Sequence, residues 1–201
     1  MDYIIEPERK IPVKAEYDTV VAGGGIAGIA AAAAAARGGA RVLLIEKQYM
    51  PGGLATAGLV TIFLPLCDGM GRQVTFGIAE ELLRLSVRHG YEGKYPSAWL
   101  ENGSYAEKAK QRFEVQYNPY IFAIETEKLL KAAGVDILFG TSVCEAYVSN
   151  GKIRHIITEN KSGRTAVALK NIIDCSGDAD ICRLAGENTV VFSQGNVPAS
   201  W

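Results

Sequence analysis

The chain has 201 residues, of which 48% are hydrophobic and 21% are charged. This length and composition are typical of a globular protein with a sizeable core, and they argue against disorder. The 21 Lys and Arg residues nearly balance the 22 Asp and Glu residues, and a net charge of −1 argues against nucleic acid as an electrostatic partner.

Targeting signals and metal-ligand patterns are absent from the sequence. The first ten residues carry charged side chains and no long apolar run, so they do not resemble a secretory signal peptide. The longest weakly polar run, residues 23–36, is too short and too rich in glycine to span a membrane. We therefore expect a cytoplasmic protein without a membrane partner. The four cysteines lack zinc-ligand spacing, so we expect no metal site and interpret them as small, mostly buried residues.

The first elements in chain order form a βαβ pattern. Residues 1–16 are expected to be a lead-in segment that pairs loosely at a sheet edge. The apolar run at residues 17–22 predicts a strand that is covered on both faces. Residues 26–37, mostly alanine, predict a helix, and residues 41–45 predict a second parallel strand.

Glycines at the start of the predicted helix match the dinucleotide-binding pattern G-x-G-x-x-G. Gly23 permits a tight turn, Gly25 lets a pyrophosphate approach the backbone, and Gly28 lets the helix lie close to the sheet. The helix N-terminus offers N–H groups and a partial positive charge to phosphates. Glu46 follows the second strand, at a distance suited to binding a ribose. A glycine turn of another α/β protein and an ordinary surface acid are the alternative interpretations, but the flanking elements favour cofactor binding.

The middle of the chain is less regular. Residues 51–58 form a glycine-rich loop, and residues 60–120 are interpreted as an inserted substrate-binding or cap-like region. Within this region, the aromatic and polar residues 90–120 predict no clear element. Hydrophobic periodicity predicts two helices and a third strand in this part of the chain, at residues 76–89, 124–133 and 135–139.

Three short strands with turn signals between them follow, and they predict an antiparallel meander. The strands are expected at residues 142–148, 152–158 and 165–169. Residues 171–178 then predict a separate buried strand that runs into another glycine turn, and residues 179–185 predict one or two helical turns. The sequence thus predicts an α/β fold: a Rossmann-like parallel sheet with helices on both faces and a three-stranded antiparallel meander.

With these motifs in this order, the chain resembles the FAD-dependent oxidoreductases of the glutathione-reductase-type fold. It is most similar to the bacterial group whose second signature is an acid–x–[ST]–Gly–Asp–Ala–Asp run, here residues 174–180. The resemblance covers residues 17–187 and implies FAD as the cofactor. It also implies transfer of hydride or electrons between flavin and an unknown small-molecule substrate.

The resemblance implies a set of cofactor-binding residues that comes from five segments. The pyrophosphate would lie at Gly23, Gly25, Ile26, Ala27 and the packing glycine Gly28, and the adenosine ribose at Glu46 with Lys47. The ribityl chain and flavin would run along Gly53 and Thr56, and the adenine would meet the Val143 backbone. The phosphate and ribityl region would also contact Ser176, Gly177 and Asp178. For Ser176 and Asp178, helix capping is an alternative role. No catalytic acid or base is assigned.

The sequence departs in two ways from the families that it resembles, and these departures limit the function that we expect. The loop at residues 52–56 lacks the cysteine pair of the disulfide reductases, which argues against dithiol chemistry. Family members also continue well past this length. We therefore expect residues 1–201 to be an FAD-binding domain whose C-terminal substrate-binding part is missing, and whose partner is a complementing chain or a second copy. The alternative functions are an NAD(P)-binding dehydrogenase domain and a non-catalytic, truncated or split nucleotide-binding module.

Overall fold

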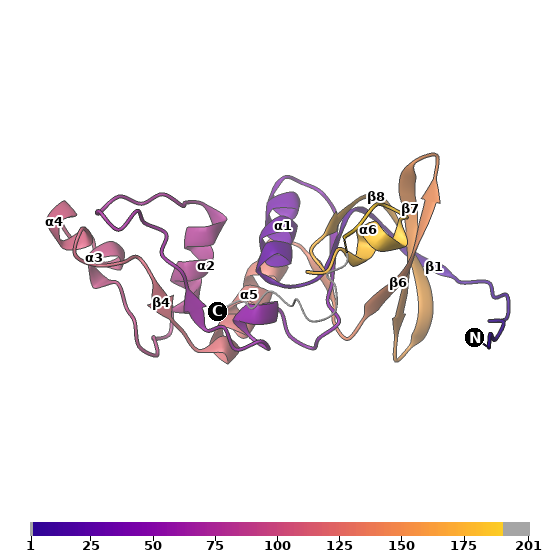
Figure 1. The fold of residues 1–201 in the computed structure, drawn as a ribbon, viewed down its shortest axis with the longest axis horizontal. Helices are drawn as coiled ribbons and strands as arrows, with labels where there is room; N and C mark the ends of the chain where they lie inside the picture. The colour runs from indigo at the N-terminus through magenta and orange to yellow at the C-terminus, as the bar shows by residue number, and fades with distance from the viewer. Residues whose placement is uncertain (1, 191–201) are drawn as a thin grey trace.

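A six-stranded sheet in the order β5-β2-β1-β8-β7-β6 organises the computed structural model, which describes residues 2–190. Strands β5, β2 and β1 are parallel, as is β8 over residues 166–174, where it pairs with β1. Strands β8, β7 and β6 form an antiparallel meander (Figure 1). The strands of this sheet are β1 (Val13–Ala22), β2 (Val42–Ile45), β5 (Asp136–Leu138), β6 (Ser142–Ser149), β7 (Lys152–Asn160) and β8 (Gly163–Asp174). The expected α/β fold with a meander is confirmed.

Strand β8 differs from the prediction of a meander strand at residues 165–169 and a separate strand within residues 171–178. It is one strand of 12 residues that pairs with β7 over residues 163–168 and with β1 over residues 166–174. Part of the expected lead-in segment belongs to β1, which begins at Val13; residues 13–16 pair with β8 on one side and have no β2 partner on the other. The β6–β7 turn is as predicted: Asn150 and Gly151 both have positive φ, as a type I′ hairpin requires.

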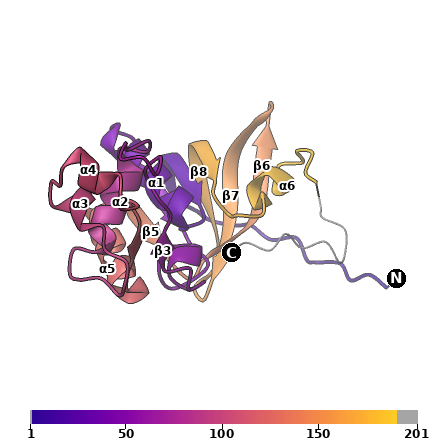
Figure 2. The same ribbon diagram turned by 60° about the vertical axis from the view of Figure 1, so that its left-hand side comes forward.

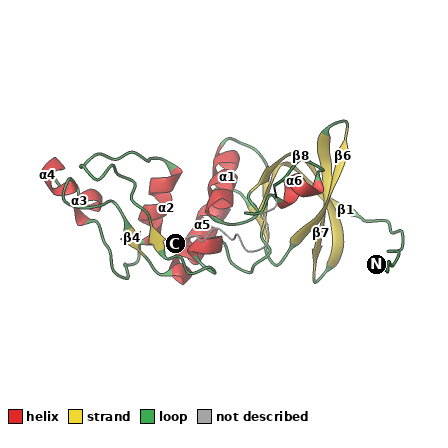
Figure 3. Cartoon of the chain, in the orientation of Figure 1, coloured by secondary structure: helices red, strands yellow, loops and turns green. Residues whose placement is uncertain are grey.

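Helices α1 to α5 lie on one side of the sheet and extend to one end of the molecule, whereas α6 lies beside the meander (Figure 2). Helix α1 (Ile26–Arg37) has the predicted bounds, whereas α5 (Pro119–Ala132) begins five residues before the expected start at residue 124. The region at residues 90–120, for which no clear element was expected, contains two short helices and a strand (Figure 3). The remaining elements are η1 (Gly53–Ala55), β3 (Ile62–Phe63), α2 (Ile78–Ser86), α3 (Ser97–Leu100), α4 (Tyr105–Lys108), β4 (Val115–Gln116) and α6 (Asp180–Leu184).

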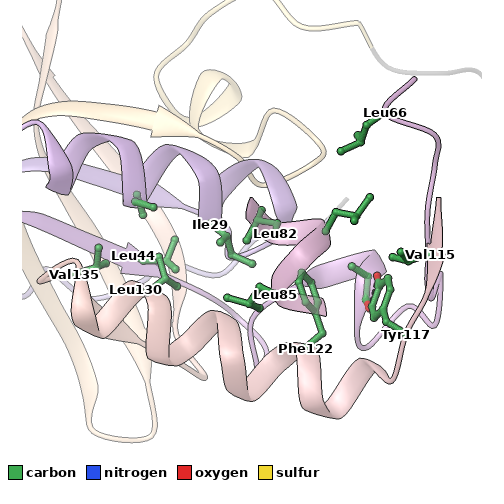
Figure 4. Packing of buried hydrophobic residues seen from close by; sticks show 14 of the residues in the cluster. Ile29, Leu44, Leu66, Leu82, Leu85, Val115, Tyr117, Phe122, Leu130 and Val135 are labelled. Carbon is green, nitrogen blue, oxygen red and sulfur yellow. Dashed lines mark hydrogen bonds between the residues drawn. The ribbon is translucent and has the colours of Figure 1, made fainter. Parts of the chain in front are cut away.

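Two hydrophobic clusters cover the two faces of the parallel strands. Because side chains alternate along a strand, Val21 and Leu44 face one cluster while Val20 and Leu43 face the other. The first cluster joins the sheet and α1 to α2, α5 and the segment around β4 (Figure 4). The second cluster lies between the parallel strands and the meander. The region at residues 60–120 therefore shares a core with the sheet.

Within residues 2–190, the longest helices are too short or too polar to cross a bilayer.

Candidate functional site

The carboxyl ends of three adjacent parallel strands define the site. Ala22 of β1 lies opposite Ile45 of β2 on one side and Asp174 of β8 on the other. Backbone hydrogen bonds extend the ladder beyond the strands: Gly23 N donates to Ile45 O at 2.8 Å, and Cys175 N donates to Ala22 O at 2.8 Å. The loops that follow these strands therefore begin side by side, at the edge where open α/β sheets bind ligands.

The first glycine turn is packed too tightly for side chains at two positions. Gly23 has a φ of 103°, and a Cβ there would lie 2.2 Å from the carbonyl oxygen of Cys175. A Cβ on Gly28 would lie 1.8 Å from the carbonyl oxygen of Gly23, so the helix contacts the turn directly. A Cβ on Gly25, by contrast, would meet no atom within 4 Å. The backbone at Gly25 therefore borders open space.

Helix α1 begins at this open position without a side-chain cap. Gly25 is its N-cap residue, and the first turn carries no acidic side chain. The first N–H groups of a helix have no acceptor within the helix, and they carry its partial positive charge. An anion in the open space would provide the missing acceptors.

Glu46 lies directly after β2 and is 6% exposed. Its Oε2 accepts a hydrogen bond from Gly24 N at 2.6 Å, and its Oε1 accepts one from Gln48 N at 2.7 Å. A carboxylate has about four lone-pair sites, so these two bonds leave acceptor capacity for a hydroxyl. Lys47, the next residue, is exposed.

The second glycine loop packs against the first. Gly52 N donates to Gly24 O at 2.7 Å, and a Cβ on Gly53 would lie 3.1 Å from the Gly25 Cα. Thr56 is 2% exposed, and its hydroxyl donates to Pro51 O at 2.7 Å. The buried Thr56 side chain therefore stabilises the conformation of this loop.

Asp174 organises the third loop. Its Oδ1 accepts hydrogen bonds from Ser176 N and Ser176 Oγ, and its Oδ2 accepts from Ile181 N and Cys182 N at 2.9 and 3.1 Å. Burial alone would raise the pKa of the Asp174 carboxyl, but the hydrogen bonds from Ser176 and Cys182 outweigh it and hold the pKa below its ordinary value. The capping role considered for Ser176 and Asp178 thus belongs mainly to Asp174, while Ser176 Oγ accepts from Asp180 N at 3.0 Å.

A cavity of about 820 Å³ lies among these loops, within the size range of ligand sites. Eleven of the residues proposed from the sequence line it: Gly23, Gly25, Ile26, Ala27, Glu46, Lys47, Gly53, Val143, Ser176, Gly177 and Asp178. Two others, Gly28 and Thr56, lie behind its wall. The structure therefore brings the five sequence segments together around one space.

Several cavity residues were missed by the sequence reasoning. Most are neighbours of proposed residues in the same loops, so adjacency was the available signal: Gly52, Leu54, Ala57, Gly58, Gln48, Thr141, Ser142, Cys175, Asp180 and Ile181. Leu54, Ala57 and Ile181 give part of the wall an apolar character suited to a ring system. All four cysteines carry free thiols and are partly exposed rather than mostly buried.

Comparison with known proteins gives one family and a shared fold. A family model described as FAD dependent oxidoreductase matches residues 18–197. No curated protein matches the chain by sequence. Among solved structures, a geranylgeranyl bacteriochlorophyll reductase-like protein from Thermoplasma acidophilum has 18% identity and a TM-score of 0.58, over 89% of this chain and 44% of its own.

Two further structures are similar at the same level. THI4 from Thermovibrio ammonificans has 18% identity and a TM-score of 0.56, over 86% of this chain and 64% of its own. L-proline dehydrogenase from P. horikoshii has 15% identity and a TM-score of 0.59, over 90% of this chain and 58% of its own. At these identities the likeness shows the fold alone. The chain spans less than two thirds of each of these structures.

Proposed function

The chain belongs to the family of FAD-dependent oxidoreductases, and from that premise we propose that its cavity binds FAD and that the protein transfers hydride or electrons between a substrate and the flavin. The observation that carries the proposal is the open backbone at Gly25, where an uncapped helix begins inside the cavity. When bound, the flavin supplies the redox chemistry, and the protein supplies binding and orientation.

The residues present fit such a cofactor. The start of α1 would hold the pyrophosphate at Gly25, Ile26 and Ala27, which line the cavity. Glu46 would accept a hydrogen bond from the adenosine ribose with its remaining lone pairs. The turn that contains Ser176 would face the cofactor from the third strand end. The substrate and the catalytic acid or base are not assigned.

Titration with FAD tests the cofactor assignment. Purified protein mixed with FAD should quench flavin fluorescence and keep the flavin absorbance bands after gel filtration. Gly25→Val should weaken binding at least tenfold, because the new side chain would fill the space that a phosphate would occupy. Gly25 has a φ of −68° and a ψ of −177°, which valine also adopts, so the fold should persist.

Ala34→Val is the matched control, because Ala34 is exposed on the same helix and does not line the cavity. It should bind FAD like the wild type. Equal FAD affinity of Gly25→Val and wild type would contradict the site assignment. Binding of NADH without binding of FAD would favour the alternative of an NAD(P)-binding dehydrogenase domain.

A further inference from the structure

Gly24, the residue between the first two glycines of the motif, has both of its backbone polar groups bonded. Its N–H donates to Glu46 Oε2 at 2.6 Å, and its carbonyl accepts from Gly52 N at 2.7 Å. Gly24 is buried and is not among the residues that line the cavity. It therefore joins the first glycine turn to the end of β2 and to the second glycine loop, and any effect it has on a ligand is indirect.

The side chain of Glu46 occupies the space next to Gly24. A Cβ on Gly24 would lie 3.0 Å from Glu46 Cβ, 3.2 Å from its Cγ and 3.1 Å from its Oε2. These distances are shorter than ordinary van der Waals contacts, so a methyl group at Gly24 would require the Glu46 side chain to shift by a few tenths of an ångström. Gly25, one residue later, has open space instead. A side chain at Gly24 would thus meet the protein, whereas a side chain at Gly25 would enter the cavity.

The Glu46 carboxylate is held from two directions. Its second oxygen accepts from Gln48 N at 2.7 Å, and the residue is 6% exposed. Hydrogen bonds to an ionised acceptor are roughly twice as strong as neutral ones, so this pair fixes the carboxylate firmly. Because Gly24 immediately precedes the helix start, its orientation sets the direction of the N–H groups at Gly25 and Ile26.

We propose that Glu46 is a positioning residue that holds the phosphate-binding turn in shape through Gly24 before any ligand binds. The effect on FAD affinity rests on the proposed function: a turn that already has its binding geometry loses less entropy when FAD binds. It assigns Glu46 a role beyond the contact with the ribose that its place after β2 predicts.

Gly24→Ala is the variant that separates the two roles. It keeps the charge of Glu46 and places its methyl group outside the cavity, yet it should weaken FAD binding about tenfold, the effect of losing one charge-assisted hydrogen bond. In a Glu46→Ala background the contacts with Cγ and Oε2 are gone and only the contact with Cβ remains. Gly24→Ala should therefore reduce FAD affinity by a clearly smaller factor in the Glu46→Ala background than in the wild type. The double-mutant cycle of these two substitutions would then be non-additive. Gly25→Ala should lose the same factor in both backgrounds.

Amide hydrogen exchange in ligand-free protein gives a readout that does not depend on FAD. The Gly24 amide should exchange slowly in the wild type and much faster in Glu46→Ala, because its acceptor is gone. Leu130→Val serves as a stability control: it lies in the core, away from the cavity, and should lower the melting temperature while FAD affinity stays unchanged.

The outcomes distinguish this inference from the proposed function. Equal exchange of Gly24 in the wild type and in Glu46→Ala would overturn the positioning role, whatever the ligand. Wild-type FAD affinity in Gly24→Ala, or additive losses in the cycle, would overturn the link between turn geometry and binding. A wild-type protein that binds no FAD would overturn the proposed function, and the exchange result would still decide whether Glu46 holds the turn.

Discussion

Ala179 adopts a left-handed backbone conformation, with a φ of 56° and a ψ of 38°, that residues with side chains rarely adopt. It stands between the turn of Ser176, Gly177 and Asp178 and the first residue of α6. The hydrogen bonds from Ile181 N and Cys182 N to Asp174 hold the start of α6 in place and so impose this conformation. The chain therefore accepts local strain beside the cavity, as proteins often do at functional sites.

Relief of this strain is testable. Ala179→Gly should raise the free energy of unfolding by roughly 0.5–1 kcal/mol, because glycine has no Cβ penalty at positive φ. Urea denaturation of the two proteins measures the difference. Ala34→Gly, in the regular part of α1, should instead lower stability by about 1 kcal/mol. Destabilisation by both substitutions would contradict the account of strain at Ala179.

Tyr117 links the loop after η1 to the core. Its hydroxyl donates to Ala55 O at 3.1 Å and to Val60 O at 3.2 Å, and burial raises its pKa to about 12. Because the pKa is higher in the folded state than in the unfolded state, the contribution to stability is complete below pH 10. It is lost as the pH rises from about 10 towards 12.

Tyr117→Phe should therefore lower stability near pH 7 by about 1–3 kcal/mol, because the buried Ala55 carbonyl and the partly buried Val60 carbonyl lose the hydroxyl that donates to them. The gap between wild type and variant should narrow when urea denaturation is repeated at pH 11. A gap that stays constant with pH would show that the Tyr117 hydroxyl does not titrate differently in the folded protein.

At the scale of single elements, a side-chain cap explains where the 14-residue helix α5 begins. Asn118 Oδ1 accepts from Tyr120 N at 3.0 Å and from Ile121 N at 3.2 Å, and Pro119 occupies the first helical position. Asparagine followed by proline is a typical helix start. This signal was available in the sequence, but the aromatic residues around it masked the beginning of α5.

The Asn118 cap gives a prediction for this element. Asn118→Ala should destabilise the protein by about 1 kcal/mol, whereas Asn118→Ser should keep most of the stability, because serine also caps helices. Thermal or urea unfolding measures both. Equal losses in the two variants would indicate that the bond from Asn118 Nδ2 to Glu92, rather than the cap, carries the effect.

Local patterns predicted the elements whose signal lies within a few residues. The alanine run of α1 and the turn at Asn150 and Gly151 are such cases, and both agree with the structure. Strand β8 was divided at Lys170 because no sequence signal shows that one strand changes partners along its length. The partners of Glu46 were likewise missed, because its bond to Gly24 joins residues 22 positions apart in the chain.

At the scale of the whole molecule, one hydrophobic cluster joins the parallel strands to the region at residues 60–120. One cluster contains Val21 and Leu44 from the sheet together with Leu82, Trp99 and Phe113 from the region at residues 60–120. That region was interpreted as an insertion, yet its buried side chains pack on the same helices as the sheet does. A contiguous cluster of this kind is the mark of one folding unit rather than two.

Leu82→Ala tests whether the region at residues 60–120 unfolds together with the rest of the chain. Leu82 is 1% exposed, so its truncation should cost about 2–5 kcal/mol of stability. In a Trp201→Phe background, Trp99 is the remaining tryptophan, so its fluorescence reports the region at residues 60–120 while far-UV circular dichroism reports the whole chain. With one shared core, both signals should have the same urea midpoint, and Leu82→Ala should lower the two midpoints together. Val167→Ala, in the cluster under the meander, should do the same. A shift of the Trp99 midpoint alone would instead show that the region at residues 60–120 unfolds as a unit of its own.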